Sequence, residues 1–249
     1  LDERRYLWKI NKFILVCLNY IHKNSKIGSS SFLFFLKNIN ILIRGKIIMQ
    51  NTAKRGNMIS TRTLVVMSIL SAISYLLMFI QAPIPGIFPD FLKIDLSDIP
   101  AIFGGMSLGP LVGFGIVVVK NVLQAITATT TGGIGEFANI LIGGSYVMIL
   151  CYSYKRSGDL KGVLIGFVLG TISMTIIGSL VNYFVMLPLY GQLMGLDAII
   201  GLGSAINPQV HDLFTFVIWM IAPFNVLKAV IISLVTLPLY KKMGNIIKK

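Results

Sequence analysis

A polar amide and an amine stand together in the last apolar stretch of the chain, where Asn225 and Lys228 lie within residues 213–240. Side chains three residues apart share one face of a helix. Pro223 cannot donate to the carbonyl of Trp219, which leaves a backbone acceptor in the same region. Ionisable groups are costly to bury in a membrane and usually face a site or a partner. We therefore expect Asn225 and Lys228 to bind a planar, polar ligand, with an interhelical contact as the alternative.

Other polar residues interrupt the apolar stretches. Asn182 is a second candidate hydrogen-bond partner for the ligand, and Asn139 fits either a site or helix packing. We expect Lys120 to serve structure, through a pair with Glu136 or by extending to the membrane surface. Aromatic residues that could stack on a ligand ring are Tyr183, Phe184 and Trp219.

Several kinds of catalysis are disfavoured by missing motifs. The chain has no Gly-rich loop ending in Gly-Lys-Ser/Thr, so we expect it not to hydrolyse ATP itself. Its two histidines cannot form a metal site alone, and we predict no metal. Gly143-Gly144-Ser145 with His211 could suggest an intramembrane serine protease, but Ser145 falls mid-helix and His211 in a loop. Helix packing explains the small residues better.

Composition identifies the class of protein that must position these residues. The chain is 55% hydrophobic and only 12% charged, with a mean hydropathy of +0.81, whereas soluble domains carry about 25% charged residues. This excludes a soluble enzyme, a disordered chain and a coiled coil, and Cys17 and Cys151 suggest no disulfide framework. We predict an all-α integral membrane protein.

Hydropathy and charge together predict six transmembrane helices with both termini in the cytoplasm. The apolar stretches are residues 63–80, 99–108, 111–130, 134–154, 162–187 and 213–240. The second is about half the usual length of a span. If it crosses the membrane, the basic loop at residues 155–161 is cytoplasmic, as the positive-inside rule requires. Two long loops, residues 81–98 and 188–212, then lie outside and are candidate binding elements. Ser97 or Asp98, followed by Pro100, is expected to cap the short helix.

The basic character is concentrated at the N-terminus. The net charge is +13, and residues 1–57 contain 11 Lys/Arg against 2 Asp/Glu. Nucleic-acid binding by the whole chain is therefore not indicated. Apolar runs in this segment are too short and broken to span a membrane. We interpret residues 1–57 as a basic extension outside the fold of residues 58–249, with Met49 the expected natural start and a surface-lying helix the alternative.

Ordered motifs from residue 58 to residue 242 resemble the riboflavin-specific substrate-binding (S) components of energy-coupling factor (ECF) transporters. They are Phe91-Leu92-Lys93-Ile94-Asp95-Leu96-Ser97-Asp98-Ile99-Pro100, Gly109-Pro110, Lys120-Asn121, Phe137-Ala138-Asn139, Val181-Asn182-Tyr183-Phe184, Pro188-Leu189-Tyr190-Gly191 and Pro223-Phe224-Asn225-Val226-Leu227-Lys228. The Asn-Tyr-Phe and Pro-Phe-Asn-x-x-Lys motifs carry most weight for riboflavin.

The resemblance implies a multi-pass protein of the bacterial cell membrane that binds riboflavin with high affinity in an outward-opening pocket. It needs no cofactor, and it delivers the vitamin inward with a transmembrane coupling protein and two cytoplasmic ATPases. Asn225 and Asn182 would bond the flavin, Lys228 would support it, and Asn139 with Lys93 and Asp95 would complete the pocket. Such proteins present an Ala-x-x-x-Ala pattern to the coupling protein, for which Ser68 and Ala72 are the nearest match.

Two other interpretations remain open. An S component for another small vitamin, such as thiamine or biotin, would have the same architecture with a different pocket lining. A membrane enzyme or channel is the distant alternative. A purified riboflavin-binding protein would be yellow with quenched flavin fluorescence, which distinguishes these cases.

Overall fold

The computed structural model describes residues 60–129 and 131–247, and the predicted extension, residues 1–57, lies outside this part of the chain. The first half contains α3 (Thr61–Met78), β1 (Gln81–Pro83), β2 (Lys93–Asp95), α4 (Asp98–Leu108), α5 (Pro110–Thr127) and α6 (Ile134–Ser157). The second half contains α7 (Leu160–Val181), η2 (Asn182–Met186), α8 (Leu187–Met194), α9 (Leu196–Ser204), α10 (Leu213–Phe216), η3 (Val217–Ile221) and α11 (Ala222–Ile247), where η marks a π-helix.

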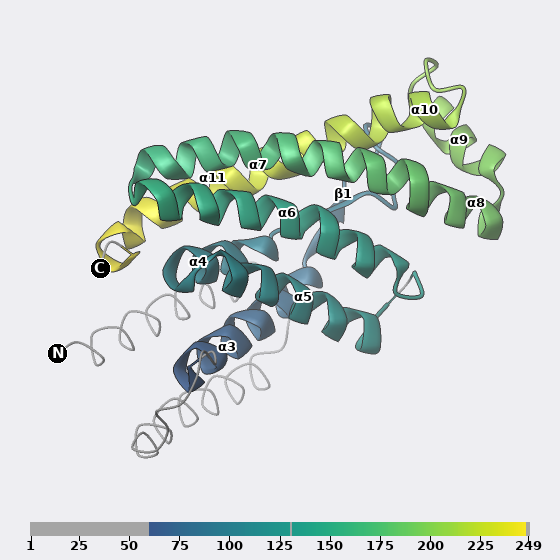
Figure 1. Ribbon diagram of the computed structural model, residues 1–249. Helices are drawn as coiled ribbons and strands as arrows, with labels where there is room; N and C mark the ends of the chain where they lie inside the picture. Colours follow the sequence, from purple (N-terminus) through teal and green to yellow (C-terminus); the bar gives the residue numbers. More distant parts are fainter. Residues whose placement is uncertain (1–59, 130, 248–249) are drawn as a thin grey trace. The chain divides into compact units, whose positions relative to one another are not determined.

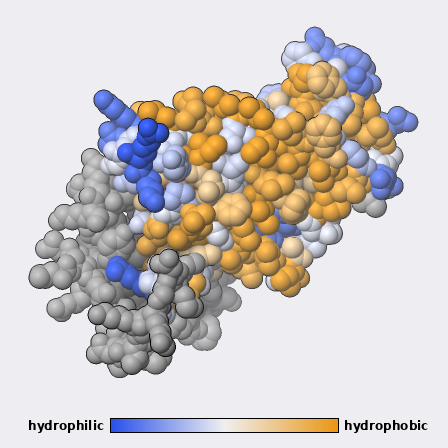
Figure 2. Space-filling view, viewed as in Figure 1, coloured by the Kyte–Doolittle hydropathy of each residue, from blue (hydrophilic) through white to orange (hydrophobic). Residues whose placement is uncertain are grey.

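Among the described residues, five helical runs are long and apolar enough to cross a membrane. They are Thr61–Met78, Pro110–Thr127, Ile134–Ser157, Leu160–Gln192 and Leu213–Lys242. Helices α6, α7 and α11 run side by side (Figure 1). An apolar belt covers the visible face, with hydrophilic side chains toward the two ends (Figure 2). The predicted membrane protein and its long helices are thus confirmed.

Helix α4 differs from the other five predicted crossings because it has only 11 residues. Its residues from Asp98 to Met106 are all buried among the other helices. The chain reverses at Gly109, whose φ of 111° favours glycine. A Cβ on Gly113 would lie 2.9 Å from the Cα of Gly105, so α4 and α5 pack through small residues.

The two predicted outer loops contain regular structure. Residues 81–98 include an antiparallel β-hairpin in which Gln81 pairs with Asp95 and Pro83 with Lys93. The all-α prediction is therefore wrong at this point, because three-residue strands carry no readable period. Residues 188–212, predicted as a loose connection, hold most of α8 and all of α9.

A proline stands two residues after the end of each of the π-helices η2 and η3. It is Pro188 after η2 and Pro223 after η3. The amide of Ala222 donates to the carbonyl of Val217, and that of Leu187 donates to Asn182. These longer steps accommodate prolines that lack a donor. Trp219, whose carbonyl was expected to lack the donor that Pro223 cannot supply, lies within the π-helix η3.

Candidate ligand-binding site

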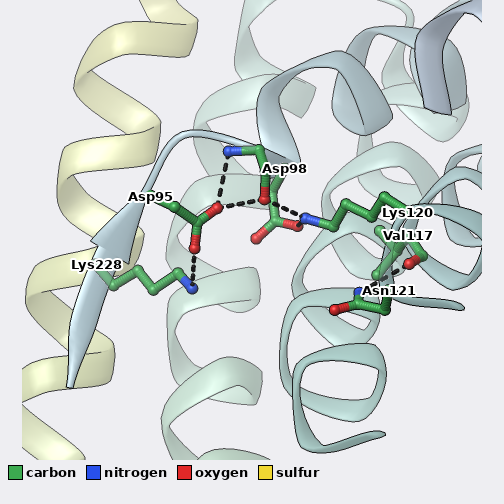
Figure 3. A network of polar contacts seen from close by, with 7 residues as sticks. Asp95, Asp98, Val117, Lys120, Asn121 and Lys228 are labelled. Carbon is green, nitrogen blue, oxygen red and sulfur yellow. Dashed lines mark hydrogen bonds and ion pairs between the residues drawn. The ribbon is translucent and has the colours of Figure 1, made fainter. Parts of the chain in front are cut away.

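Two of the charged residues predicted at the site, Asp95 and Lys228, contact each other. The Nζ of Lys228, on α11, donates to the Oδ2 of Asp95, at the end of β2, over 3.0 Å. Figure 3 shows these side chains pointing toward each other from opposite elements. The structure thus brings Asp95 and Lys228, two of the residues expected at the site, into direct contact, and Asp95 occupies one donor of the ammonium group.

Ser97 extends this contact to a second ion pair, between Lys120 and Asp98. Its backbone N–H donates to Asp95 Oδ1 over 2.9 Å, and its hydroxyl donates to the same oxygen. The ammonium group of Lys120 donates to Ser97 Oγ and to Asp98 Oδ1, both over 2.5 Å. We call Asp95, Ser97, Asp98, Lys120 and Lys228 the buried polar network. It connects the hairpin and α4 to α5 and α11.

Charge balance explains how these groups can be buried. The network contains two carboxylates and two ammonium groups, and each charged side chain is at most 9% exposed. Lys228 and Ser97 hold the carboxylate of Asp95, and Lys120 holds the carboxylate of Asp98. Buried charges are tolerated when they are paired and hydrogen-bonded in this way.

Two predictions about this region are wrong in detail. Ser97 occupies the N-cap position of α4, but its side chain makes no capping bond, because the hydroxyl contacts Asp95 and Lys120 instead. Lys120 was expected to pair with Glu136 or extend to the surface, and it pairs with Asp98. Glu136 accepts hydrogen bonds from the hydroxyls of Thr129 and Thr131.

The two predicted amides meet around one glycine. Asn182 donates to the carbonyl of Gly178 over 2.8 Å, and Asn225 donates to the carbonyl of Ile221 over 2.9 Å. A Cβ on Gly178 would lie 2.6 Å from the Nδ2 of Asn225. Gly178 therefore makes room for Asn225 against α7, and it brings Asn182 and Asn225 to one junction. Sequence reasoning missed Gly178, since its role appears only when two helices pack.

The remaining predicted residues have varied environments. Tyr183 is half-buried and packs edge-to-face on Phe184, with ring centroids 4.9 Å apart. Phe184 is 69% exposed and Trp219 is 45% exposed, so both rings lie largely on the outer surface of the helices. Asn139 is half-buried and Lys93 is exposed.

The hairpin packs on the helices that carry the amides. The ring of Phe88, between the two strands, meets the ring of Phe224 edge-to-face with centroids 5.4 Å apart. Phe91 stacks on Phe216 with centroids 6.3 Å apart. Ile94, on β2, packs against the apolar cluster that contains Phe88, Phe216 and Phe224. The hairpin is thus fixed to α10 and α11 by apolar contacts as well as by Asp95.

The predicted docking residues lie on an open part of α3. Ser68 is exposed and its hydroxyl donates to the carbonyl of Leu64, and Ala72 is half-buried. Ser71 and Ser74 are buried toward the other helices. One face of α3 therefore presents small side chains outward at a separation of one turn.

The contacts of Ser145 also bear on the alternative of an intramembrane serine protease. The Ser145 hydroxyl donates to the carbonyl of Ile142 in its own helix. A Cβ on Gly143 would lie 3.1 Å from both carboxylate oxygens of Asp98. The small residues therefore serve helix packing, as expected, and one of them leaves room for the buried polar network.

Comparisons with known proteins place this architecture in a family. The family model described as "ECF transporter, substrate-specific component" matches residues 62–240. The chain is 35% identical over 199 residues to riboflavin transporter RibU of Staphylococcus aureus (strain TCH60), covering 80% of this chain and 99% of that protein. It is 36% identical over 178 residues to riboflavin transporter FmnP of Bacillus subtilis (strain 168), covering 70% and 87%.

A solved structure supports the same relationship. The structure described as "Structure and mechanism of the S component of a bacterial ECF transporter" matches with a TM-score of 0.60 and 34% identity. The match covers 76% of this chain and 98% of that one. With the family match over residues 62–240, these findings mean that the chain belongs to the substrate-specific (S) components of ECF transporters.

Proposed function

We propose that this protein is the riboflavin-binding S component of an ECF-type vitamin uptake transporter in a bacterial cell membrane. The observation that carries the proposal is the junction of Asn182 and Asn225 around Gly178. The relatives described above are named riboflavin transporters, and their alignment with this chain covers most of their length. The protein captures riboflavin with high affinity at the outer face and delivers it inward.

The chemistry of the junction fits one edge of a flavin. The ring system of riboflavin has a flat apolar face and a row of carbonyl and imide groups along one edge. Amides donate and accept in the same plane, so Asn182 and Asn225 match that edge. Lys228, one turn beyond Asn225, adds a positively charged donor. Tyr183 offers an aromatic edge beside the amides, and Asn139 with Lys93 and Asp95 completes the pocket.

Six membrane crossings are supported by the depth of the buried polar network. Lys228 lies at the middle of the 30-residue run Leu213–Lys242, so its partner Asp95 lies at mid-depth too. Helix α4 starts three residues later and has 11 residues, which span about 16 Å, or half of a bilayer core of roughly 30 Å. The hairpin and α4 together thus make one crossing, and both termini are cytoplasmic.

Transport against a gradient requires partners. With no phosphate-binding motif of its own, the chain works with a transmembrane coupling protein and two cytoplasmic ATPases. The small side chains of Ser68 and Ala72 allow a partner helix to approach the backbone of α3 closely.

The direct test is a flavin titration of the purified full chain in detergent. We expect a yellow protein that quenches riboflavin fluorescence at one-to-one stoichiometry. Thiamine and biotin are the controls, because an S component for another vitamin would bind one of them and leave flavin fluorescence unchanged. Full fluorescence at saturating protein would rule out the riboflavin assignment.

A further inference from the structure

Exposed cations gather at the end of the described helices where α6 turns into α7. Lys155 and Arg156 lie in the last turn of α6, Lys161 is the second residue of α7, and all three side chains are exposed. The acidic residue of the turn, Asp159, accepts a hydrogen bond from the backbone of Gly162 over 3.0 Å and caps α7. The turn therefore has a net positive charge.

The end of α11 adds to this charge. The rings of Tyr154 and Tyr240 meet edge-to-face with centroids 5.8 Å apart, which brings the ends of α6 and α11 together. Lys241 and Lys242 follow directly and are exposed. The two outer loops at the opposite end have a net negative charge. Their exposed charged residues are Asp90, Lys93, Asp197 and Asp212.

An exposed apolar stripe continues from the basic turn along α7. Leu164, Ile165 and Val168 are 45%, 52% and 61% exposed. They follow Lys161 by three, four and seven residues, so all four side chains share one helix face. On α6, Tyr152 is 63% exposed one turn before Lys155, and exposed tyrosines are common at the level of lipid headgroups.

A cationic cluster above an apolar stripe matches the two parts of a phospholipid. We propose that the α6–α7 turn binds an anionic phospholipid, with its phosphate against Lys155, Arg156 and Lys161 and its acyl chains along the exposed face of α7. The long stems of these side chains can lie on apolar surface while their charged ends reach the phosphate. A free phosphate ion would use the cations but not the stripe, so the occupant is a lipid.

The experiment measures lipid preference in the full chain reconstituted in bilayers. Spin-labelled phosphatidylglycerol and phosphatidylcholine report the fraction of each lipid in contact with the protein. We expect the parent to prefer phosphatidylglycerol. The triple variant Lys155→Gln/Arg156→Gln/Lys161→Gln should lose roughly fivefold in this preference for each cation removed, corresponding to about 1 kcal/mol per cation near an anionic surface. The basic residues 1–57 are present in both proteins and cancel in the comparison.

Two controls separate this proposal from general charge effects. Asp197→Asn removes an exposed charge at the other end, outside the proposed riboflavin pocket, and should leave the preference unchanged. Val168→Asn keeps every cation but interrupts the apolar stripe, so the variant should hold phosphatidylglycerol less tightly. Soluble glycerophosphate, which has the phosphate but no acyl chains, should bind the variant and the parent equally. Equal preference for the two lipids in the parent, or an unchanged preference in the triple variant, would overturn the proposal. So would displacement of the lipid by glycerophosphate at equal concentration.

Discussion

The carboxylate of Asp95 lies 3.0 Å from the ammonium group of Lys228, although 133 residues separate them in the chain. Asp95 ends the second strand of the hairpin, and Lys228 lies halfway along the last helical run. This pair therefore holds the end of the hairpin against α11, one turn from Asn225. The same ion pair that positions the loop also orients Lys228, a residue proposed to bind riboflavin.

Asp95→Asn tests that relationship. The substitution leaves the Lys228 ammonium group buried without its carboxylate, and removing one partner of a buried pair costs about 3–5 kcal/mol. We expect a lower thermal midpoint for the detergent-purified protein and weaker riboflavin binding. Asp90→Asn is the matched control, because Asp90 is an exposed carboxylate in the same loop.

A double variant separates charge from shape. Asp95→Leu/Lys228→Met removes both charges, so it should regain much of the stability that Asp95→Asn loses. It should still bind riboflavin weakly, because Lys228 is gone. An Asp95→Asn protein as stable as the parent would contradict a structural role for the pair.

Gly178→Ala tests the meeting point of the two amides. The added Cβ would lie 2.6 Å from the Nδ2 of Asn225, so the amide must move. We expect riboflavin affinity to fall by roughly 10- to 100-fold, the range for losing one or two well-placed hydrogen bonds. Gly201→Ala is the control, since a Cβ there meets no atom within 4 Å. Equal loss in both variants would mean that Gly178 has no special relation to the site.

Much of this architecture could be predicted because a membrane imposes simple rules. Long apolar stretches predict spans, and a polar group inside a span indicates a site or a partner. These rules led to the five long helices and to Asn182, Asn225 and Lys228. Asp95, by contrast, was expected at the site only because its loop motif resembles that of the family.

The partners of the charged groups could not be predicted in the same way. Lys120 and Asp98 are 22 residues apart, and their contact depends on how α4 packs against α5. Sequence spacing therefore suggested Glu136 as partner, although Glu136 contacts two threonine hydroxyls. The hairpin escaped notice because its strands have only three residues each. Both failures concern packing in three dimensions, which hydropathy does not report.

Asn225→Ala removes the amide most directly assigned to the flavin edge. Part of the ring edge would then be buried without a partner, which costs about 1–3 kcal/mol, or roughly 5- to 150-fold in affinity. Fluorescence titration measures the change, with Val226→Ala, an exposed neighbour on the same helix, as the control. The site assignment fails if Asn225→Ala and Lys228→Ala both bind riboflavin as the parent does.

Deletion of residues 1–48 tests whether the basic extension contributes to binding. The shortened protein keeps every helix described above and both outer loops. We expect unchanged membrane insertion and an unchanged dissociation constant for riboflavin. Poor insertion or lost binding would show that this basic segment has a functional role.

Ala72→Trp tests docking on α3. A tryptophan at this half-buried position would hold a partner helix away from the backbone and remove the close packing that small residues allow. Ala72 belongs to none of the contacts around Asn225, so riboflavin binding by the purified protein should persist. Riboflavin uptake should fall in cells that carry the complete transporter.

The matched control for docking is Ile172→Trp, which adds the same bulk at a side chain that is 52% exposed on α7. That face of α7 is apolar and exposed along its length, as expected for a surface against lipid tails, so uptake should remain normal. Equal loss of uptake in both variants would indicate a general defect in insertion instead of a docking face. Normal uptake by Ala72→Trp would exclude α3 as the docking helix, and accumulation of riboflavin by this chain without partners would overturn the whole energy-coupling proposal.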